Sequence, residues 1–167
     1  PSALTELDTF PRLLLNHVAT RAAHPATREK DLGIWQTWTW SQVAEEVRAL
    51  ACGLAAQGFK RGMNLAIIGD NRPRLYWTMA AVQALGGVPV PLYQDAVAEE
   101  MVYVLNDADV HFAVVEDQEQ VDKMLEARPQ VPALAHVIYD DPRGMRNYAG
   151  AGYEGVALLE DIRFEIR

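Results

Sequence analysis

The feature that most constrains the fold is a regular alternation of short apolar runs and amphipathic stretches across the middle of the chain. Short runs with the length of buried strands lie at 64–68, 88–92, 111–115 and 134–139. Apolar residues with helical spacing fill the intervals at 73–85, 97–108 and 117–128. Strands alternating with helices in this way predict right-handed βαβ units. We therefore expect a doubly wound, mainly parallel α/β sheet with helices on both faces.

One of these runs differs from the others because Pro89 and Pro91 interrupt it. Proline has no N–H to donate to a neighbouring strand, so it is largely confined to edges and irregular positions. The run at 88–92 is therefore predicted to be an edge strand or an irregular one.

The part before this alternation predicts a helix followed by a β-hairpin. Residues 10–23 have an apolar helical face, and the following polar/apolar alternation turns at Gly33. Thr39 and Gln42 then have the spacing of a capping box that starts the next helix, and Gly58 ends it.

The sequence after residue 139 is rich in loop-forming residues. Its "GAGYEG" matches the dinucleotide-binding glycine pattern by chance, since a loop precedes it and the strand–turn–helix context is missing. The stretch "VALLEDI" at 156–162 predicts a short terminal helix that hangs free of the core. We expect 1–167 to form one subdomain, with a helix and hairpin over 9–40, a βαβ core over 41–139 and a loop-rich tail over 140–167.

Composition excludes several classes of function. The 15 Lys and Arg against 23 Asp and Glu give a net charge of −8, and no basic stripe is present, so nucleic acid is not an expected partner. No apolar run reaches the ~20 residues that a membrane-spanning helix needs. Cys52 is the single cysteine, which rules out an intrachain disulfide framework and favours a reducing, cytoplasmic compartment.

Polar groups follow three of the predicted strands: Asp70, the turn Tyr93-Gln94-Asp95, and the pair Glu116-Asp117. In open α/β sheets, ligands bind outside the carboxyl ends of the strands. A receiver-like regulator would accordingly bind Mg²⁺ at Asp70 together with Glu116 or Asp117.

A plainer interpretation of the same acids is stronger. Asp117 and Gln120 have the spacing of a capping box, and Asp70 with Asn71 suits a corner that satisfies the free N–H groups of a helix starting at Pro73. No nucleophile elbow, phosphate-binding glycine loop or spaced metal ligands occur in the sequence. We expect no catalytic residue and no metal site within the chain.

A family resemblance adds what these residues alone do not give. The stretches "TWTW", "IIGDNRP", "GGVPVPLYQ", "VVEDQEQVDK" and "VIYDDPRGM" follow one another, over roughly residues 9–145, in the order and spacing of a known family. The chain resembles the N-terminal part of the adenylate-forming acyl-CoA synthetases, and it is most similar to bacterial long-chain fatty acid–CoA ligases. None of these stretches is a catalytic signature.

The resemblance implies a ligase that uses ATP, Mg²⁺ and CoA to convert a fatty acid to its acyl-adenylate and then to the thioester. The family's phosphate loop and lid lysine lie further along the chain, so this segment alone is expected to be inactive and to bind none of these cofactors. The resemblance also implies that Tyr93, Gln94 and Asp95 approach the CoA side of the cleft. The Gln-Asp pair departs from the proline or glycine that many members have there. The "GDNRPRLYW" stretch, by the same resemblance, is a scaffold corner.

Two further expectations concern what the chain does outside catalysis. One alternative is a complete, non-catalytic binding or interaction module that reuses the fold. A subdomain without its partner also exposes apolar surface, so we expect some self-association through the sheet edge or the 156–162 segment. Peripheral contact with the inner membrane stays open.

Overall fold

The computed structural model describes residues 7–163. Its elements, in chain order, are α1 (Phe10–Arg21), β1 (Pro25–Asp31), β2 (Ile34–Thr39), α2 (Trp40–Ala56), β3 (Asn64–Ile68), α3 (Pro73–Ala84), β4 (Val88–Leu92), α4 (Ala98–Asp107), β5 (Val110–Val115), α5 (Gln118–Ala127), the 3₁₀ turn η1 (Arg128–Gln130), β6 (His136–Tyr139), the 3₁₀ turn η2 (Met145–Asn147), β7 (Val156–Leu158) and α6 (Leu159–Ile162).

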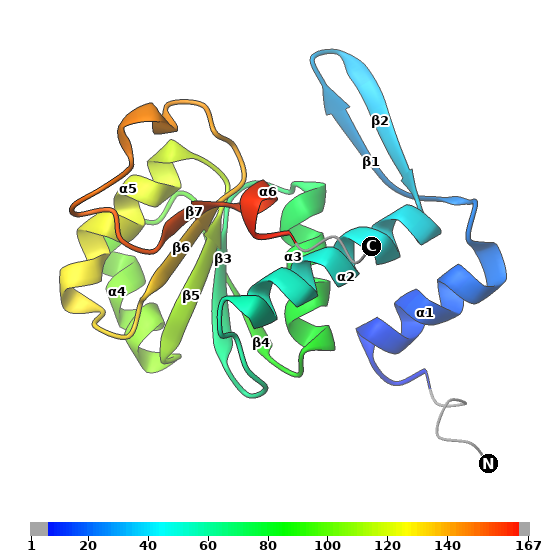
Figure 1. Cartoon of the computed structure of the whole chain (residues 1–167), viewed down its shortest axis with the longest axis horizontal. Coiled ribbons are helices and arrows are strands. Elements are labelled where there is room, and N and C mark those ends of the chain that lie inside the picture. Colours follow the sequence, from blue (N-terminus) through cyan, green and yellow to red (C-terminus); the bar gives the residue numbers. More distant parts are fainter. Residues whose placement is uncertain (1–6, 164–167) are drawn as a thin grey trace.

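Strands β3 to β7 form one parallel sheet in the order β4-β3-β5-β6-β7. The chain leaves β3 for β4 on one side, then crosses to β5 on the other, so the strand order reverses between β3 and β5. Helices α2 and α3 cover one face of the sheet, and α4 and α5 cover the other (Figure 1). The predicted doubly wound α/β fold, preceded by a helix and a hairpin, is confirmed.

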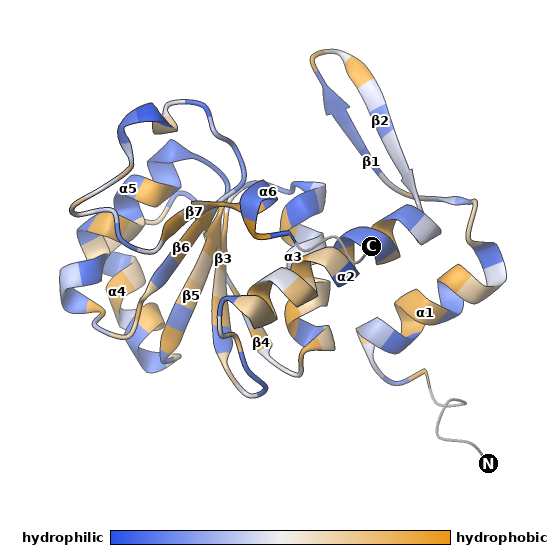
Figure 2. Cartoon of the chain, in the orientation of Figure 1, coloured by the Kyte–Doolittle hydropathy of each residue, from blue (hydrophilic) through white to orange (hydrophobic). Residues whose placement is uncertain are grey.

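The central strands are apolar throughout because both of their faces are buried. Leu65 and Ile67 of β3 pack in the core beneath α2 and α3, whereas Ala66 and Ile68 pack beneath α4 and α5. Successive side chains of a strand point to opposite faces, so a strand between two helical layers needs a continuous apolar run. Figure 2 shows these hydrophobic strands enclosed between helices whose outer surfaces are polar.

Strand β4 lies at the edge of the sheet, as its prolines predicted. The N–H of Val88 donates to the carbonyl of Met63 at 3.0 Å, on the β3 side. Pro89 and Pro91 alternate with Val88 along the strand, so their backbone nitrogens face away from β3. A missing N–H on that side breaks no ladder bond. The same two prolines remove donors that an additional strand would need.

The hairpin of β1 and β2 turns through Leu32 and Gly33, whose φ angles of 45° and 83° are both positive, as in a type I′ turn. It projects from the body of the molecule (Figure 1). Trp38 at its base packs edge-on against Trp77 of α3, with ring centroids 5.2 Å apart. This contact anchors the base of the hairpin to the helix layer.

One predicted capping box is confirmed and the other is half wrong. At the start of α2, the Thr39 N–H donates to Gln42 Oε1 at 2.9 Å and the Gln42 N–H donates to Thr39 Oγ1 at 3.3 Å. At α5, the Gln120 N–H donates to Asp117 Oδ1 at 3.2 Å, but the Gln120 amide group donates to the Gln94 carbonyl instead of returning to the cap. A tertiary contact replaces the local one.

The prediction of a free helix over 156–162 is wrong. Val156–Leu158 forms β7, which pairs in parallel with β6, and only Leu159–Ile162 is helical. Leu159 is completely buried, and the Ile162 carbonyl lies so close to α2 that a Cβ on Gly53 would come within 2.0 Å of it. The tail therefore extends the sheet beyond residue 139. The strand predicted over 134–139 also starts later, at His136.

Candidate functional site

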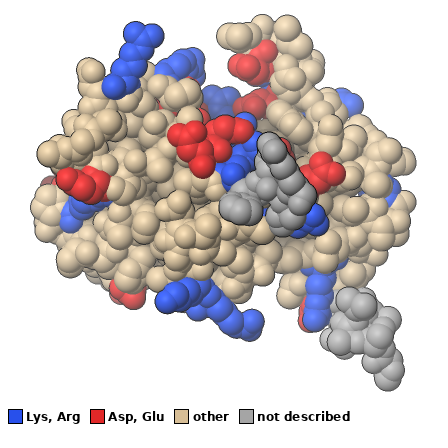
Figure 3. Space-filling model, in the orientation of Figure 1, with Lys and Arg blue, Asp and Glu red and all other residues tan. Residues whose placement is uncertain are grey.

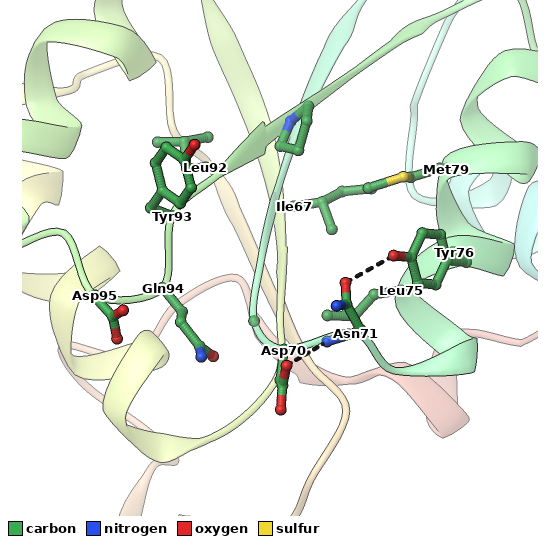
Figure 4. Close-up of a pocket in the computed structure, with 12 residues that line it drawn as sticks. Ile67, Asp70, Asn71, Leu75, Tyr76, Met79, Leu92, Tyr93, Gln94 and Asp95 are labelled. Atoms are coloured by element: carbon green, nitrogen blue, oxygen red, sulfur yellow. Dashed lines mark hydrogen bonds between the residues drawn. The ribbon is translucent and has the colours of Figure 1, made fainter. Parts of the chain in front are cut away.

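A cavity of about 380 Å³ lies where the carboxyl ends of β3 and β4 diverge (Figure 4). Three segments form its wall: the corner after β3, the first turns of α3, and the turn after β4. The lining residues are Ile67, Gly69, Asp70, Asn71, Leu75, Tyr76, Met79, Pro91, Leu92, Tyr93, Gln94 and Asp95. The three residues of the predicted turn, Tyr93 to Asp95, all border this cavity.

Gly69 permits the close approach of the β3 and β5 ends that shapes this corner. A Cβ built on Gly69 would lie 2.6 Å from the Glu116 Cβ and 2.7 Å from the Leu75 Cδ1. Both distances are shorter than carbon atoms tolerate, so any larger residue would force the corner apart. The glycine in "IIGDNRP" is thus required by packing.

The side chains of Asp70 and Asn71 form hydrogen bonds, but not with the free backbone N–H groups at the start of α3. Asp70 Oδ1 accepts from the Asn71 N–H at 2.8 Å, and Asn71 Oδ1 accepts from the Tyr76 hydroxyl at 2.7 Å (Figure 4). Helix α3 has Arg72 at its N-cap position and no side-chain capping bond. The prediction that Asp70 and Asn71 cap this helix is therefore wrong, and Asn71 instead holds the phenol of Tyr76 beside the cavity.

The backbone of the turn after β4 is hydrogen-bonded to α5, whereas the Tyr93 side chain is exposed to solvent. The Gln94 carbonyl accepts from the Gln120 side-chain amide at 3.2 Å and from Lys123 Nζ at 2.5 Å, both on α5. Tyr93 is 88% exposed. The backbone of the turn is thus fixed, while its aromatic side chain is available to contact a ligand.

The acid at the end of β5 is fully engaged by the corner. Glu116 Oε1 accepts from Arg72 Nε at 2.7 Å, and its Oε2 accepts from the Asp70 N–H at 2.6 Å. Arg72 Nη1 also lies 3.2 Å from Glu29 Oε1 of the hairpin. The hydrogen bond to Glu116, with a smaller contribution from Glu29, raises the pKa of Arg72 above its usual value despite some burial.

This ion-pair network occupies the place where an open α/β sheet usually binds its ligand. The crevice between β3 and β5 is the point at which the strand order reverses. Here the guanidinium of Arg72 and the carboxylate of Glu116 lie across it. The cavity is displaced to the neighbouring β3–β4 side.

The strand-end acids do not assemble into a metal site. Glu116 is bound by Arg72 and a backbone N–H, and Asp117 accepts the bond that caps α5. Within residues 7–163, no three His, Cys, Asp or Glu side chains converge as metal ligands. The receiver-like interpretation thus has no binding geometry in the part of the chain that the structure describes.

Arg74, which follows Pro73 in the sequence, forms ion pairs with the tail of the chain, which starts at residue 140. Its Nη1 lies 3.4 Å from Asp140 Oδ1 and 2.9 Å from Glu160 Oε2. Burial raises the pKa of Asp140, and the opposing effect of Arg74 is smaller. The two arginines of "NRPR" therefore join the sheet to the hairpin and to the tail, which is a structural role.

The chemistry of the cavity suits a neutral, flexible ligand better than a polyphosphate. No lysine or arginine is among its lining residues, and Asp70 and Asp95 contribute negative charge. Phosphate groups are held by cations, backbone nests or helix N-termini with free donors. Apolar side chains such as Ile67 and Met79 line the cavity together with the Tyr76 and Tyr93 rings.

Comparison with known proteins identifies the family. The sequence pattern described as "AMP-binding enzyme" matches residues 15–157. The chain belongs to the AMP-binding enzyme family. It is 33% identical over 123 residues to the long-chain-fatty-acid–CoA ligase ACSBG2 of Rattus norvegicus, covering 72% of this chain and 18% of that protein. It is 30% identical over 138 residues to the long-chain-fatty-acid–CoA ligase FadD15 of Mycobacterium bovis, covering 83% of this chain and 23% of that protein.

Solved structures of adenylate-forming enzymes share the fold. The A-PCP didomain of carboxylic acid reductase from Segniliparus rugosus, in complex with AMP, superposes with a TM-score of 0.79 at 17% identity, over 95% of this chain and 27% of that one. Acetoacetyl-CoA synthetase from Streptomyces lividans gives 0.78 at 21% identity, over 93% and 25%. The sequence spans about a fifth of its curated relatives, so it corresponds to an N-terminal portion of an adenylate-forming enzyme, as the resemblance implied.

Sequence reasoning found one side of the cavity and missed the other. It singled out Tyr93, Gln94 and Asp95, which the structure brings together. It assigned Tyr76, as part of "GDNRPRLYW", to a scaffold corner, yet Tyr76 is 52% exposed and lines the same cavity with Asn71. The spacing of Tyr76 and Met79, one helical turn apart after a strand end, is the signal that could have identified them.

Proposed function

We propose that this chain is the first subdomain of an ATP-dependent long-chain fatty acid–CoA ligase, and that its β3–β4 cavity forms the CoA-side wall of the active-site cleft. The observation that carries the proposal is the cavity itself, which lies at the carboxyl edge of the sheet in a chain of the AMP-binding family. The names of the long-chain-fatty-acid–CoA ligases with 30–33% identity support the substrate class.

The lining residues fit the thiol end of CoA better than its phosphates. The pantetheine arm is a narrow, largely uncharged chain of amides and methylenes that ends in a thiol. The side chains of Asn71 and Gln94 can exchange hydrogen bonds with its amides, and the rings of Tyr76 and Tyr93 can pack against its methylenes. The phosphates of CoA and of ATP would bind outside this cavity.

In this proposal the chain contributes position rather than chemistry. ATP with Mg²⁺ supplies the activated phosphate and CoA supplies the thiol. The residues of this chain orient the thiol-bearing arm by means of a turn that Gln120 and Lys123 hold in place. Fixing one reactant in this way lowers the entropic barrier of the second step. The segment alone is proposed to be inactive. We assign the enzyme to the cytoplasm, which suits the free thiol of Cys52 in this chain.

The test is a ligase assay on the natural-length polypeptide that contains this sequence. Incubation with ATP, Mg²⁺, CoA and palmitate is expected to release AMP and to form palmitoyl-CoA, measured by mass spectrometry. The 167-residue chain is expected to form none under the same conditions. Thioester formation by the short chain, or none by the long one with fatty acids of any length, contradicts the proposal.

A further inference from the structure

Asn71 and Tyr76 are joined by a hydrogen bond that fixes the direction of the Asn71 side-chain amide. The Tyr76 hydroxyl donates to Asn71 Oδ1 at 2.7 Å, and the Asn71 backbone N–H donates to Asp70 Oδ1 at 2.8 Å (Figure 4). A side-chain amide has one accepting oxygen and one donating NH₂ group. Because the oxygen is directed at Tyr76, Asn71 presents its Nδ2 to the remaining space, and Nδ2 has no acceptor within residues 7–163.

Two other side chains with donors line the cavity, but neither is held in this way. Gln94 also has an amide, yet its side chain makes no hydrogen bond within the part of the chain that the structure describes. Tyr93 is 88% exposed, and its hydroxyl is likewise unbonded there. A donor that is already fixed loses less conformational entropy on binding than a side chain that must first be ordered. Asn71 is therefore the donor of the three that is oriented before a ligand arrives.

Positive charge does not provide an alternative means of binding within the cavity. No lysine or arginine is among the lining residues. Figure 3 shows that the basic side chains on the drawn face are dispersed rather than gathered into one patch. Recognition of a ligand by this cavity therefore depends on neutral hydrogen bonds and on apolar contact.

We propose that Asn71 is a specificity-determining residue that donates to a carbonyl oxygen in the pantetheine arm of CoA, and that Tyr76 is a positioning residue that holds the Asn71 amide in the donating orientation. This assignment rests on the proposed function, in which the arm enters the β3–β4 cavity. The arm has amide carbonyls along its length, whereas the hydrocarbon chain of a fatty acid has no acceptor. An acyl chain in the cavity would leave Nδ2 desolvated without a partner, which weakens binding about tenfold or more.

The opposite wall of the cavity complements this arrangement. Figure 4 shows Asn71 and Tyr76 on one side, and Tyr93, Gln94 and Asp95 on the other. The C=O and N–H of a planar trans amide point in opposite directions. An amide whose carbonyl accepts from Asn71 thus directs its N–H toward the turn after β4, where the Asp95 carboxylate and the Gln94 side-chain oxygen can accept it. The reverse orientation would bring the carbonyl oxygen against the negative charge of Asp95.

The test measures the two half-reactions of the natural-length enzyme separately. Palmitate-dependent exchange of pyrophosphate into ATP reports the adenylate step, and thioester formation at saturating ATP and palmitate gives the KM for CoA. Asn71→Asp keeps an oxygen for the Tyr76 hydroxyl but replaces the Nδ2 donor by a second oxygen. We expect it to raise the KM for CoA about tenfold or more, with little change in the exchange rate. Tyr76→Phe should raise the KM for CoA about fivefold, because the Asn71 amide is no longer held.

Asn147→Asp is the matched control, because it makes the same chemical change at an exposed asparagine of η2 outside the cavity lining. Its KM for CoA should equal that of the wild type. If the KM for CoA is unchanged in an active Asn71→Asp enzyme, the assignment is overturned and the proposed function stands. An equal loss in the exchange reaction, or a raised KM for palmitate instead of CoA, also overturns it, because Asn71 would then act on the fold or on the acyl chain. A wild-type enzyme that forms the adenylate but no thioester refutes the proposed function and this assignment together.

Discussion

Replacing Leu159 by alanine measures whether the tail is part of the core. Leu159 is completely buried in the cluster beneath α2 and α3. The change removes three carbon atoms, worth about 2.4 kcal/mol at ~0.8 kcal/mol each. The cavity left behind adds to this, so we expect a loss of roughly 3–4 kcal/mol in the free energy of unfolding. A loss of this size is a large part of the total stability of a small domain.

The assay is urea unfolding of the wild type and the variant, followed by circular dichroism. The matched control is Leu15→Ala on α1, where the side chain is 64% exposed and a change of at most ~0.5 kcal/mol is expected. If Leu159→Ala costs less than about 1 kcal/mol, then the tail does not pack on the sheet and the argument for β7 and α6 fails.

Two other perturbations test the corner and the tail. Gly69→Ala would place a Cβ 2.6 Å from the Glu116 Cβ and should lower stability by about 2 kcal/mol or more. The matched control is Gly150→Ala, because a Cβ at position 150 would have no atom within 4 Å. This substitution should cost only about 1 kcal/mol of stability, from the positive φ of the glycine. Equal thermal shifts in the two variants would contradict the packing argument. Burial raises the pKa of Asp140, so the native state binds its proton more tightly than the unfolded chain does, and the resulting stabilisation is present at low pH and lost as the pH rises through the native pKa. Asp140→Asn, which cannot ionise, should therefore gain stability relative to the wild type as the pH rises above about 4, the ordinary pKa of an aspartate. A difference in urea midpoint that does not change with pH would exclude this effect.

Those parts of the fold that depend on local pattern could be predicted from the sequence. The run "NLAII" of β3 is apolar on both faces, and that is sufficient to place it between two helical layers. Pro89 and Pro91 identify an edge because the donor they lack is a local property. Thr39 and Gln42 form their capping box within one helical turn. In each case the physical cause lies within a few residues.

The parts that could not be predicted depend on residues far apart in the chain. The pairing of Arg72 with Glu116 and Glu29 joins three elements, and no spacing in the sequence indicates it. The amide of Gln120 leaves its local cap because the Gln94 carbonyl is within reach only in the folded state. β7 has three residues, too few to show a periodicity, so only the open edge of β6 decides that it is a strand.

Self-association of the chain stays a prediction. Of the two surfaces expected to mediate it, the 156–162 segment is engaged through the buried Leu159 and Ile162. The outward edge of β4 lacks the donors of Pro89 and Pro91. Sedimentation velocity over a range of concentrations measures it directly.

The measurement that tests the central claim most directly is the rate at which a CoA disulfide labels a cysteine introduced at the cavity. In the natural-length enzyme, Tyr93→Cys is compared with Tyr103→Cys; the two tyrosines are 88% and 73% exposed, but Tyr103 lies on α4 outside the lining of this cavity. If the cavity forms the CoA-side wall, the cysteine at position 93 is labelled about tenfold faster or more, the equivalent of 1.4 kcal/mol of specific binding, and free CoA slows it. Equal labelling rates at the two positions, unaffected by free CoA, would contradict the account.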